Sequence, residues 1–318
     1  MKKIFGIVRY LFFISIFVAL IFGVQDMLKE QENYEEVLKN KIVLISHVYS
    51  NPYWQSIKKG AEKAAEDKNI IVEFQGPDYA SVDEGIRLIK MAYASNVSGI
   101  ITYVQDENSY NSIINKIIED DIPLVTIDSD AEKSKRLSYI GTDNVEAGRV
   151  GAKEMIKQIG DKGDIGIILG GIEVKNQVER VQGFKSYIEE NSNLKITNTE
   201  SSDSYLLQAE LAAKKILTDN TNIRALFCTS AQDGIGAAKA IKSMKLVGKV
   251  KIVCFDALSQ TLELIEEGVI SATVAQNPYV MGQESVNTVV DVINGKKVNE
   301  LQLVEVLVIN DANVGEYK

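Results

Sequence analysis

From residue 41 onward, short apolar runs alternate with longer segments in which apolar residues recur every three or four positions. The short runs are typical of buried β-strands, and the longer segments are typical of amphipathic helices. The pattern predicts strands over residues 41–46, 70–74, 98–104, 122–128, 164–169, 194–198, 223–228, 250–255, 270–275 and 301–309. It predicts helices between them, for example over residues 54–68, 82–94, 144–159 and 205–218.

The regular order of strand, helix and strand indicates right-handed crossovers and mainly parallel sheets. Two blocks of comparable length repeat this order, so we expect an α/β protein with two doubly wound lobes instead of one large sheet. Ligands of such sheets bind beyond the carboxyl ends of the strands. The residues that follow the predicted strands are therefore the first candidates for a functional site.

The N-terminal segment has a different pattern. Apolar residues dominate from Ile4 to Val24, a stretch about as long as a membrane-spanning helix requires, and Lys2 and Lys3 precede it. A cleaved secretory signal peptide is the alternative, but no Ala-x-Ala site follows the stretch and no Cys is present there for a lipid anchor. We expect residues 1–24 to form an uncleaved signal anchor, a single-pass helix in the cell membrane with the ligand domain outside the cytoplasm.

Residues 25–40 are acidic, and their few apolar positions fit one stripe of a short helix. We interpret this segment as a solvated stalk that separates the globular part from the membrane. The alternative is a helix that also contacts a partner.

Composition narrows the function. The chain has 318 residues, enough for two domains of ordinary size, and a formal net charge of -9, which disfavours nucleic acid as a partner because such binding depends on basic patches. One His and two Cys leave little material for a zinc site or a His-based catalytic triad. Cys228 and Cys254 each end an apolar run, so we interpret them as small buried residues and not as a disulfide.

The ends of the predicted strands carry carboxylates, amides, one guanidinium group and aromatic rings. They contain no pair of nucleophile and base, and no glycine-rich loop with the spacing that cradles a phosphate. The candidate ligand-binding residues are Asn51, Tyr53, Trp54, Asp106, Asp128, Arg180, Tyr205, Ser230, Asp256 and Gln276.

This set of side chains suits a sugar. The C–H faces of a sugar ring pack on aromatic rings, here Tyr53 and Trp54, while its hydroxyl groups need the paired donors and acceptors of Asp, Asn, Gln and Arg. Each Asp or Asn taken alone could instead cap a helix, since strand-to-helix turns commonly use these residues. Arg180 could form a surface salt bridge. The aromatic pair favours ligand binding over these alternatives.

Several motifs resemble those of the type I periplasmic sugar-binding proteins, near the ribose- and galactose-binding members, with the ligand domains of LacI-type repressors as relatives. These motifs are "SNPYW", "GAEKAAED", "IPLVTID", "YIGTDNVEAGR", "RVQGF", "VCFDA" and "ISATVAQNPYVMG". The resemblance runs from about Lys41 to the C-terminus. It implies two Rossmann-like lobes that are joined by three crossover strands and close over a sugar in the cleft between them.

By this resemblance the crossovers fall near Thr142, Gln276 and Glu305. The N-lobe is then 41–142 plus 277–305, and the C-lobe is 143–276 plus 306–318. The implied hydroxyl contacts come from Asn51, Asp128, Arg180, Asp256 and Gln276, and the implied ring stacking from Tyr53 and Trp54.

Two positions depart from the ribose-binding pattern. Ser129 follows Asp128 where ribose binders have an Arg, and Ser230 stands where they have an Asn. A different pentose, such as xylose, or a hexose is therefore expected.

Three functions remain to be distinguished. The first, which we favour, is a sugar sensor that signals to a membrane histidine kinase, because the predicted anchor resembles that of membrane-anchored sugar sensors, among them a xylose-binding one. The second is the substrate-binding component of a sugar ABC importer, with a permease as partner. The third, an α/β enzyme, is disfavoured by the missing GxSxG motif and the lone His47. No cofactor or metal is expected.

Overall fold

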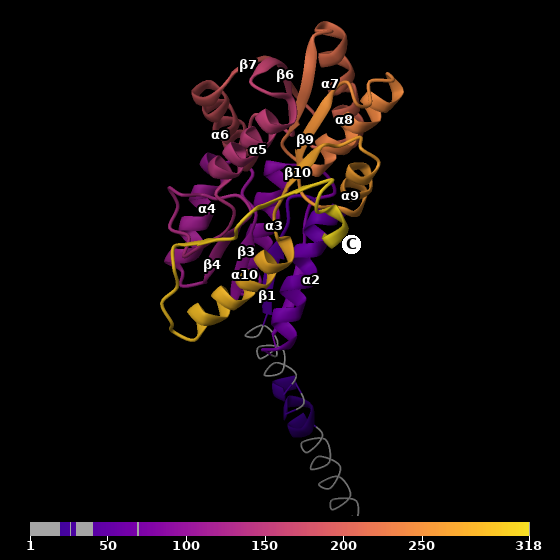
Figure 1. The fold of residues 1–318 in the computed structure, drawn as a ribbon. Helices are drawn as coiled ribbons and strands as arrows, with labels where there is room; N and C mark the ends of the chain where they lie inside the picture. The colour runs from indigo at the N-terminus through magenta and orange to yellow at the C-terminus, as the bar shows by residue number, and fades with distance from the viewer. Residues whose placement is uncertain (1–19, 26, 30–40, 69, 318) are drawn as a thin grey trace, which may run out of the picture.

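The computed structural model describes residues 20–25, 27–29, 41–68 and 70–317. From Lys41 onward these residues form two α/β lobes, one above the other in Figure 1. Within the described part of the chain no helix is both long enough and apolar enough to span a membrane. The expected anchor over residues 1–24 and the expected stalk over residues 25–40 lie largely outside the described residues.

The first sheet has six strands in the order β11-β5-β4-β3-β1-β2, and all neighbours in it are parallel. Its strands are β1 (Lys41–Ile45), β2 (Ile71–Gln75), β3 (Gly99–Thr102), β4 (Leu124–Ile127), β5 (Tyr139–Gly141) and β11 (Leu301–Leu303). Every residue of β3 and β4 is buried. Continuous burial of this kind is expected for parallel strands that are covered on both faces, and it explains their mostly apolar sequences.

The second sheet also has six strands, in the order β12-β10-β9-β8-β6-β7. Only β12 runs antiparallel to its neighbour. The strands are β6 (Lys162–Leu169), β7 (Asn193–Ser201), β8 (Ile223–Cys228), β9 (Lys251–Phe255), β10 (Ala272–Ala275) and β12 (Leu307–Asn310).

Helices cover both faces of each sheet. In the lower lobe of Figure 1, α2 (Pro52–Glu66) and α10 (Pro278–Ile293) pack on one face, and α3 (Val82–Ala94) and α4 (Glu107–Glu119) pack on the other. In the upper lobe, α5 (Asn144–Ile159) and α6 (Lys175–Asn191) pack opposite α7 (Leu206–Asp219), α8 (Ala231–Ser243) and α9 (Ser259–Glu266). A 3-10 helix (Val314–Tyr317) follows β12.

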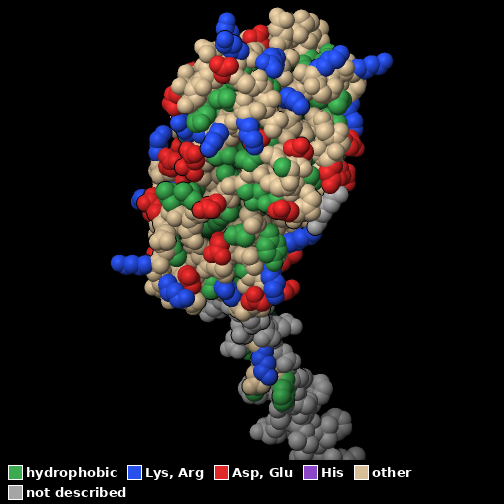
Figure 2. Space-filling view, in the orientation of Figure 1, with side chains coloured by type: hydrophobic (Ala, Val, Ile, Leu, Met, Phe, Trp, Pro, Cys, Tyr) green, Lys and Arg blue, Asp and Glu red, His purple; other side chains and the backbone are tan. Residues whose placement is uncertain are grey.

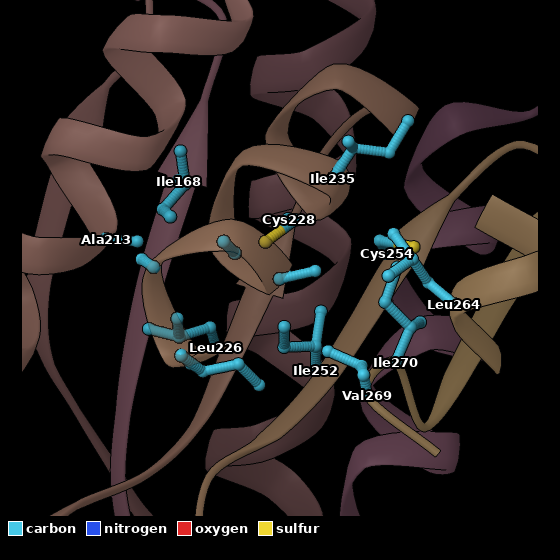
Figure 3. Packing of buried hydrophobic residues seen from close by; sticks show 14 of the residues in the cluster. Ile168, Ala213, Leu226, Cys228, Ile235, Ile252, Cys254, Leu264, Val269 and Ile270 are labelled. Carbon is cyan, nitrogen blue, oxygen red and sulfur yellow. The ribbon is translucent and has the colours of Figure 1, made fainter. Parts of the chain in front are cut away.

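The two cysteines are free and buried, which confirms their interpretation as small core residues. Both belong to the apolar core between the second sheet and α7, α8 and α9. Figure 3 shows their sulfur atoms among the isoleucine and leucine side chains of this core.

The C-terminal strand prediction is wrong in one respect. The apolar run 301–309 is not one strand, because β11 belongs to the first sheet and β12 to the second. The chain thus changes sheet three times, after β5, after β10 and between β11 and β12. Both strands lie at sheet edges, and Leu301, Leu303 and Leu307 stay exposed. Figure 2, which has the orientation of Figure 1, shows hydrophobic side chains among charged ones across the middle of the face toward the viewer.

In two pairs of helices, a glycine of one helix faces a backbone carbonyl oxygen of the other. A Cβ atom at Gly60 of α2 would overlap the carbonyl oxygen of Tyr279, which begins α10 together with Pro278. In the upper lobe, a Cβ atom at Gly183 of α6 would overlap the carbonyl oxygen of Val145 in α5. The close approach of α5 and α6 fixes the position of α6 on its lobe.

We therefore expect the substitution Gly183→Ala to lower the free energy of unfolding by about 1–3 kcal/mol, because the new methyl group meets a backbone atom that cannot rotate away. Chemical denaturation of the two proteins measures the difference. Gly315→Ala is the matched control, since a Cβ atom there meets nothing within 4 Å. Equal stability of the Gly183→Ala and Gly315→Ala variants would contradict this account of the α5–α6 contact.

Candidate functional site

A cavity of about 60 Å³ lies between the two lobes, at the carboxyl ends of their strands. A cavity of this volume holds a few water molecules, which suits one small polar ligand. Its walls come from the loops and first helical turns that follow the strands. The lining residues are His47, Val48, Asn51, Tyr53, Trp54, Tyr103, Asp128, Asn176, Gln177, Arg180, Ser204, Ser230, Ala231, Gln232, Asp256, Leu258 and Gln276.

Asp128 follows β4 and connects the two lobes. Its Oδ1 accepts a hydrogen bond of 2.6 Å from the Tyr53 hydroxyl of the same lobe, and its Oδ2 accepts one of 2.9 Å from Asn176 Nδ2 of the other lobe. Burial raises the pKa of Asp128 to about 6, although Arg180 and these two hydrogen bonds act in the opposite direction. The carboxylate is thus held by donors from both sides of the cleft.

Asp256 follows β9 and stands in the same place in the other lobe. Both aspartates have positive φ angles, 65° for Asp128 and 67° for Asp256. Residues other than glycine rarely adopt this left-handed conformation, and such strained positions concentrate at functional sites. Burial raises the pKa of Asp256 as well.

A chain of hydrogen bonds joins Asp256 to the strands that link the lobes. Gln276 Nε2 donates to Asp256 Oδ1 over 2.7 Å, and Thr142 Oγ1 donates to Gln276 Oε1 over 2.9 Å. Thr142 follows β5 and Gln276 follows β10, which are two of the points where the chain passes between the sheets. The cavity wall and the hinge therefore share these polar side chains.

Arg180, on α6, is the cationic group of the cavity. Its Nε donates to Asn144 Oδ1 and its Nη1 to the carbonyl oxygen of Thr229, each over 2.9 Å. The guanidinium carbon lies 4.3 Å from the ring centre of Phe255, a cation–π contact. These contacts fix the guanidinium plane and leave Nη2, which has no hydrogen-bond partner within the described residues.

Four buried polar atoms in the cavity lining lack a hydrogen-bond partner within the described part of the chain: His47 Nε2, Asn176 Oδ1, Arg180 Nη2 and Ser204 Oγ. Burial lowers the pKa of His47 to about 4, so the imidazole is neutral at pH 7. The four atoms thus comprise a charged donor, an acceptor and two groups that serve as either. Buried groups of this kind cost free energy unless a ligand or water satisfies them.

The aromatic side chains gather on the N-lobe wall. The Tyr53 and Trp54 rings are nearly perpendicular, at 81° with centroids 6.1 Å apart, and Trp54 and Tyr103 meet at 85°. Because Tyr53 and Trp54 are perpendicular, they cannot both lie flat on the same face of a ligand. The wall therefore offers ring faces and edges in different directions.

Eight of the ten predicted site residues line the cavity, namely Asn51, Tyr53, Trp54, Asp128, Arg180, Ser230, Asp256 and Gln276. Two of them also cap helices. Asn51 Oδ1 accepts from the backbone N–H of Tyr53, and Ser230 Oγ accepts from that of Asp233. Helix capping and lining of the cavity are thus combined in the same residues.

The structure places the other two predicted residues elsewhere. Asp106 caps α4, where its Oδ2 accepts from the backbone N–H of Ser109 over 2.9 Å, because β3 ends at Thr102 and Tyr103 takes the position that faces the cavity. Tyr205 lies in a neighbouring surface groove with Tyr79 and is about half exposed.

Sequence reasoning did not select several lining residues, chiefly His47, Tyr103, Asn176, Gln177 and Ser204. Asn176 precedes Arg180 by four residues, so the helical spacing places both on one face of α6. That spacing was the available signal for Asn176. Within the described residues, no group of three or more His, Cys, Asp or Glu side chains is placed to hold a metal ion.

Comparison with known proteins agrees with this geometry. Residues 42–297 match the model of the periplasmic binding protein domain. The ribose import binding protein RbsB of Bacillus subtilis (strain 168) is 26% identical over 255 residues, which cover 79% of this chain and 81% of that protein. The match to binding proteins identifies this chain as a binding protein and not as an enzyme.

Two solved structures are more similar in sequence. They are described as "XylFII molecule" and "XylFII-LytSN complex", and they are 55% and 54% identical to this chain, with TM-scores of 0.82 and 0.83. The similarity covers 85% and 86% of this chain, respectively, and 98% of the matched chain in each structure.

The pKa of Asp128 makes the stability of the protein depend on pH. Because the pKa is raised in the folded state from 3.8 to about 6, the folded protein binds the proton more tightly, and the contribution of Asp128 to stability falls as pH rises from about 4 to 6. Asp128→Asn removes this contribution. We expect the free energy of unfolding of the wild type to fall relative to that of Asp128→Asn as pH rises from about 4 to 6, and their difference to stay constant at higher pH. Urea denaturation at a series of pH values measures this difference. Parallel pH profiles of the two proteins would overturn this.

Proposed function

Since the chain belongs to the periplasmic binding protein family, we propose that it is an extracytoplasmic monosaccharide-binding protein that closes on its sugar and signals to a membrane sensor histidine kinase. The unsatisfied polar atoms in the cavity carry the first part of this proposal. A sugar hydroxyl both donates and accepts hydrogen bonds, so neighbouring hydroxyl groups can satisfy Arg180 Nη2 and Asn176 Oδ1 together. The aromatic wall then contacts the apolar C–H faces of the ring.

The proposed ligand is a single neutral sugar. Arg180 faces two carboxyl groups, Asp128 and Asp256, so the cavity already contains the countercharges of its one cation, and His47 is neutral. A sugar acid would add a further negative charge to this enclosed site. The small volume favours a pentose, such as xylose, or a hexose over an oligosaccharide.

The proposed movement is a rotation of the lobes about the three segments that join them. The hydrogen bond between Asn176 and Asp128 spans the cleft, so it forms only when the lobes are closed. A sugar that contacts both lobes favours the closed state through its higher affinity for that state.

The proposed partner follows from the similarity to the XylFII-LytSN complex, whose XylFII-type chain shares 54% of its sequence with this one. We propose that the closed lobes are recognised by the extracytoplasmic region of a sensor histidine kinase. We further propose that the apolar N-terminal segment holds the protein in the membrane beside this kinase, with the lobes outside the cytoplasm.

A second candidate function is that of the substrate-binding component of a sugar ABC importer. The similarity to the ribose import binding protein RbsB favours it. The two functions share the sugar site and differ in the membrane protein that recognises the closed lobes.

Sugar binding is tested with the full-length protein in detergent, titrated calorimetrically with D-xylose, D-ribose, L-arabinose, D-glucose and D-galactose. We expect at least one of these sugars to bind, and we expect Arg180→Met to weaken that binding roughly ten- to hundredfold, since hydrogen bonds to charged groups contribute about 1.5–3 kcal/mol.

Arg149→Met is the matched control, because Arg149 pairs with Glu190 on the surface of the same lobe, outside the cavity. A wild-type protein that binds none of these sugars would argue against the proposed ligand class. Equal affinities of the Arg180→Met and Arg149→Met variants would argue against the site.

The partner is tested by affinity purification of the protein from membranes of its own cells, with and without the bound sugar, followed by mass spectrometry and a phosphorylation assay. We expect a histidine kinase to copurify, and its autophosphorylation to change with the sugar. Recovery of a transporter permease without any kinase would support the importer function instead.

A further inference from the structure

Helix α6 begins with a lysine that reaches the other lobe. The Lys175 Nζ atom lies 3.8 Å from Glu107 Oε2 and 3.7 Å from Glu132 Oε1, both in the N-lobe, and 3.8 Å from Glu179 Oε1 on its own helix. This Nζ atom is buried and makes no hydrogen bond within the described residues. A buried ammonium group is therefore stabilised mainly by carboxylates, two of them across the cleft.

The position of Lys175 does not favour the helix that carries it. A positive charge at the first residue of a helix opposes the helix dipole, and α6 has no side-chain cap. Glu179, one turn further along, compensates within α6, but Glu107 and Glu132 belong to the other lobe. The location of the charge is thus explained by contacts between the lobes better than by the stability of α6.

The side chain of Glu107 is fixed by contacts within its own lobe. It is the first residue of α4, where Asp106 caps the helix, and its Oε1 accepts a hydrogen bond of 2.6 Å from the backbone N–H of Lys133. Its side chain is only 13% exposed. The carboxylate is therefore fixed in its own lobe before Lys175 approaches, which reduces the entropy that the contact costs.

Two consecutive residues of α6 thus meet the N-lobe. Asn176 donates to Asp128 inside the ligand cavity, whereas Lys175 is not among the residues that line it. We propose that Lys175 is an affinity-setting residue that stabilises the closed lobes without contacting the ligand. This inference rests on the proposed function only for its readout by sugar affinity.

The physical consequence concerns the closed population. If only the closed state binds the sugar, the observed dissociation constant equals the dissociation constant of the closed state divided by the fraction of ligand-free protein that is closed. Loss of the Lys175 contacts lowers that fraction and weakens binding without altering any group that touches the sugar. Because the Glu132 side chain is 68% exposed and that of Lys175 is 19% exposed, salt screens part of this contribution.

The test uses the substitution Lys175→Met in the full-length protein, with the tightest-binding sugar of the five named above as the probe. We expect the dissociation constant to rise roughly two- to tenfold. We also expect its dependence on salt between about 50 and 500 mM to become weaker, because the ion pairs that salt screens are lost.

Lys133→Met is the matched control. Lys133 Nζ lies 3.9 Å from the same Glu107 carboxylate, but it belongs to the same lobe and is mostly exposed, so its loss leaves closure unchanged. Glu107→Gln keeps an oxygen for the Lys133 N–H, and we expect its effect and that of Lys175→Met to be non-additive in a double-mutant cycle. Glu179→Gln tests the alternative that Lys175 acts only within α6.

A second readout does not need any sugar. Spin labels at Lys90→Cys and Lys239→Cys, one exposed position in each lobe, report the distance between the lobes of the ligand-free protein. We expect Lys175→Met to shift this distance distribution toward longer values relative to Lys133→Met. Identical distributions and identical affinities of these two variants would overturn the proposal. Failure of the wild type to bind any sugar would overturn the proposed function and leave the distance measurement to decide on Lys175.

Discussion

The carboxylate of Asp128 is the group on which the organisation of this molecule depends. It lies at the end of a buried parallel strand, in a left-handed conformation, and accepts hydrogen bonds from Tyr53 in its own lobe and Asn176 in the other. A buried carboxylate without such donors would be costly, so each of these partners is needed. The closed arrangement of the lobes and the chemistry of the cavity are therefore parts of one hydrogen-bond network.

The two lobes share the same local arrangement at the cavity. Asp128 and Asp256 follow equivalent strands with nearly equal φ angles, and a pair of glycine-spaced helices supports each sheet on one face. What differs is the partner group. Asp256 accepts a hydrogen bond from Gln276 of its own lobe, which follows a strand that leads to the hinge, whereas Asp128 also accepts one from Asn176 across the cleft. Asp256 is therefore linked to the hinge, and Asp128 is linked to the surface on which the lobes close.

The sequence predicted most of this fold, because parallel strands buried on both faces have unmistakable apolar runs. The helices over 82–94 and 144–159 have the predicted bounds. The three-residue strand β5 was too short for such a signal, and the run 301–309 hid a change of sheet. In the site, Tyr103 and not Asp106 lines the cavity, because β3 ends two residues earlier than the apolar pattern suggested. The spacing from Arg180 places Asn176 on the same face of α6, but no local pattern indicates that Asn176 contacts Asp128 of the other lobe.

The contacts between the lobes also limit what a sensor of this design can do. A ligand shifts an equilibrium only by the difference between its affinities for the two states. If contacts without the ligand, such as Asn176 to Asp128 and Lys175 to Glu107, made closure complete, the sugar would change nothing. If they were absent, more of the binding energy would be consumed in closing the lobes. A partly exposed ion-pair cluster contributes modestly and responds to salt, so it stabilises the closed state without making closure complete. The unsatisfied polar groups of the cavity then require the sugar before the closed state predominates.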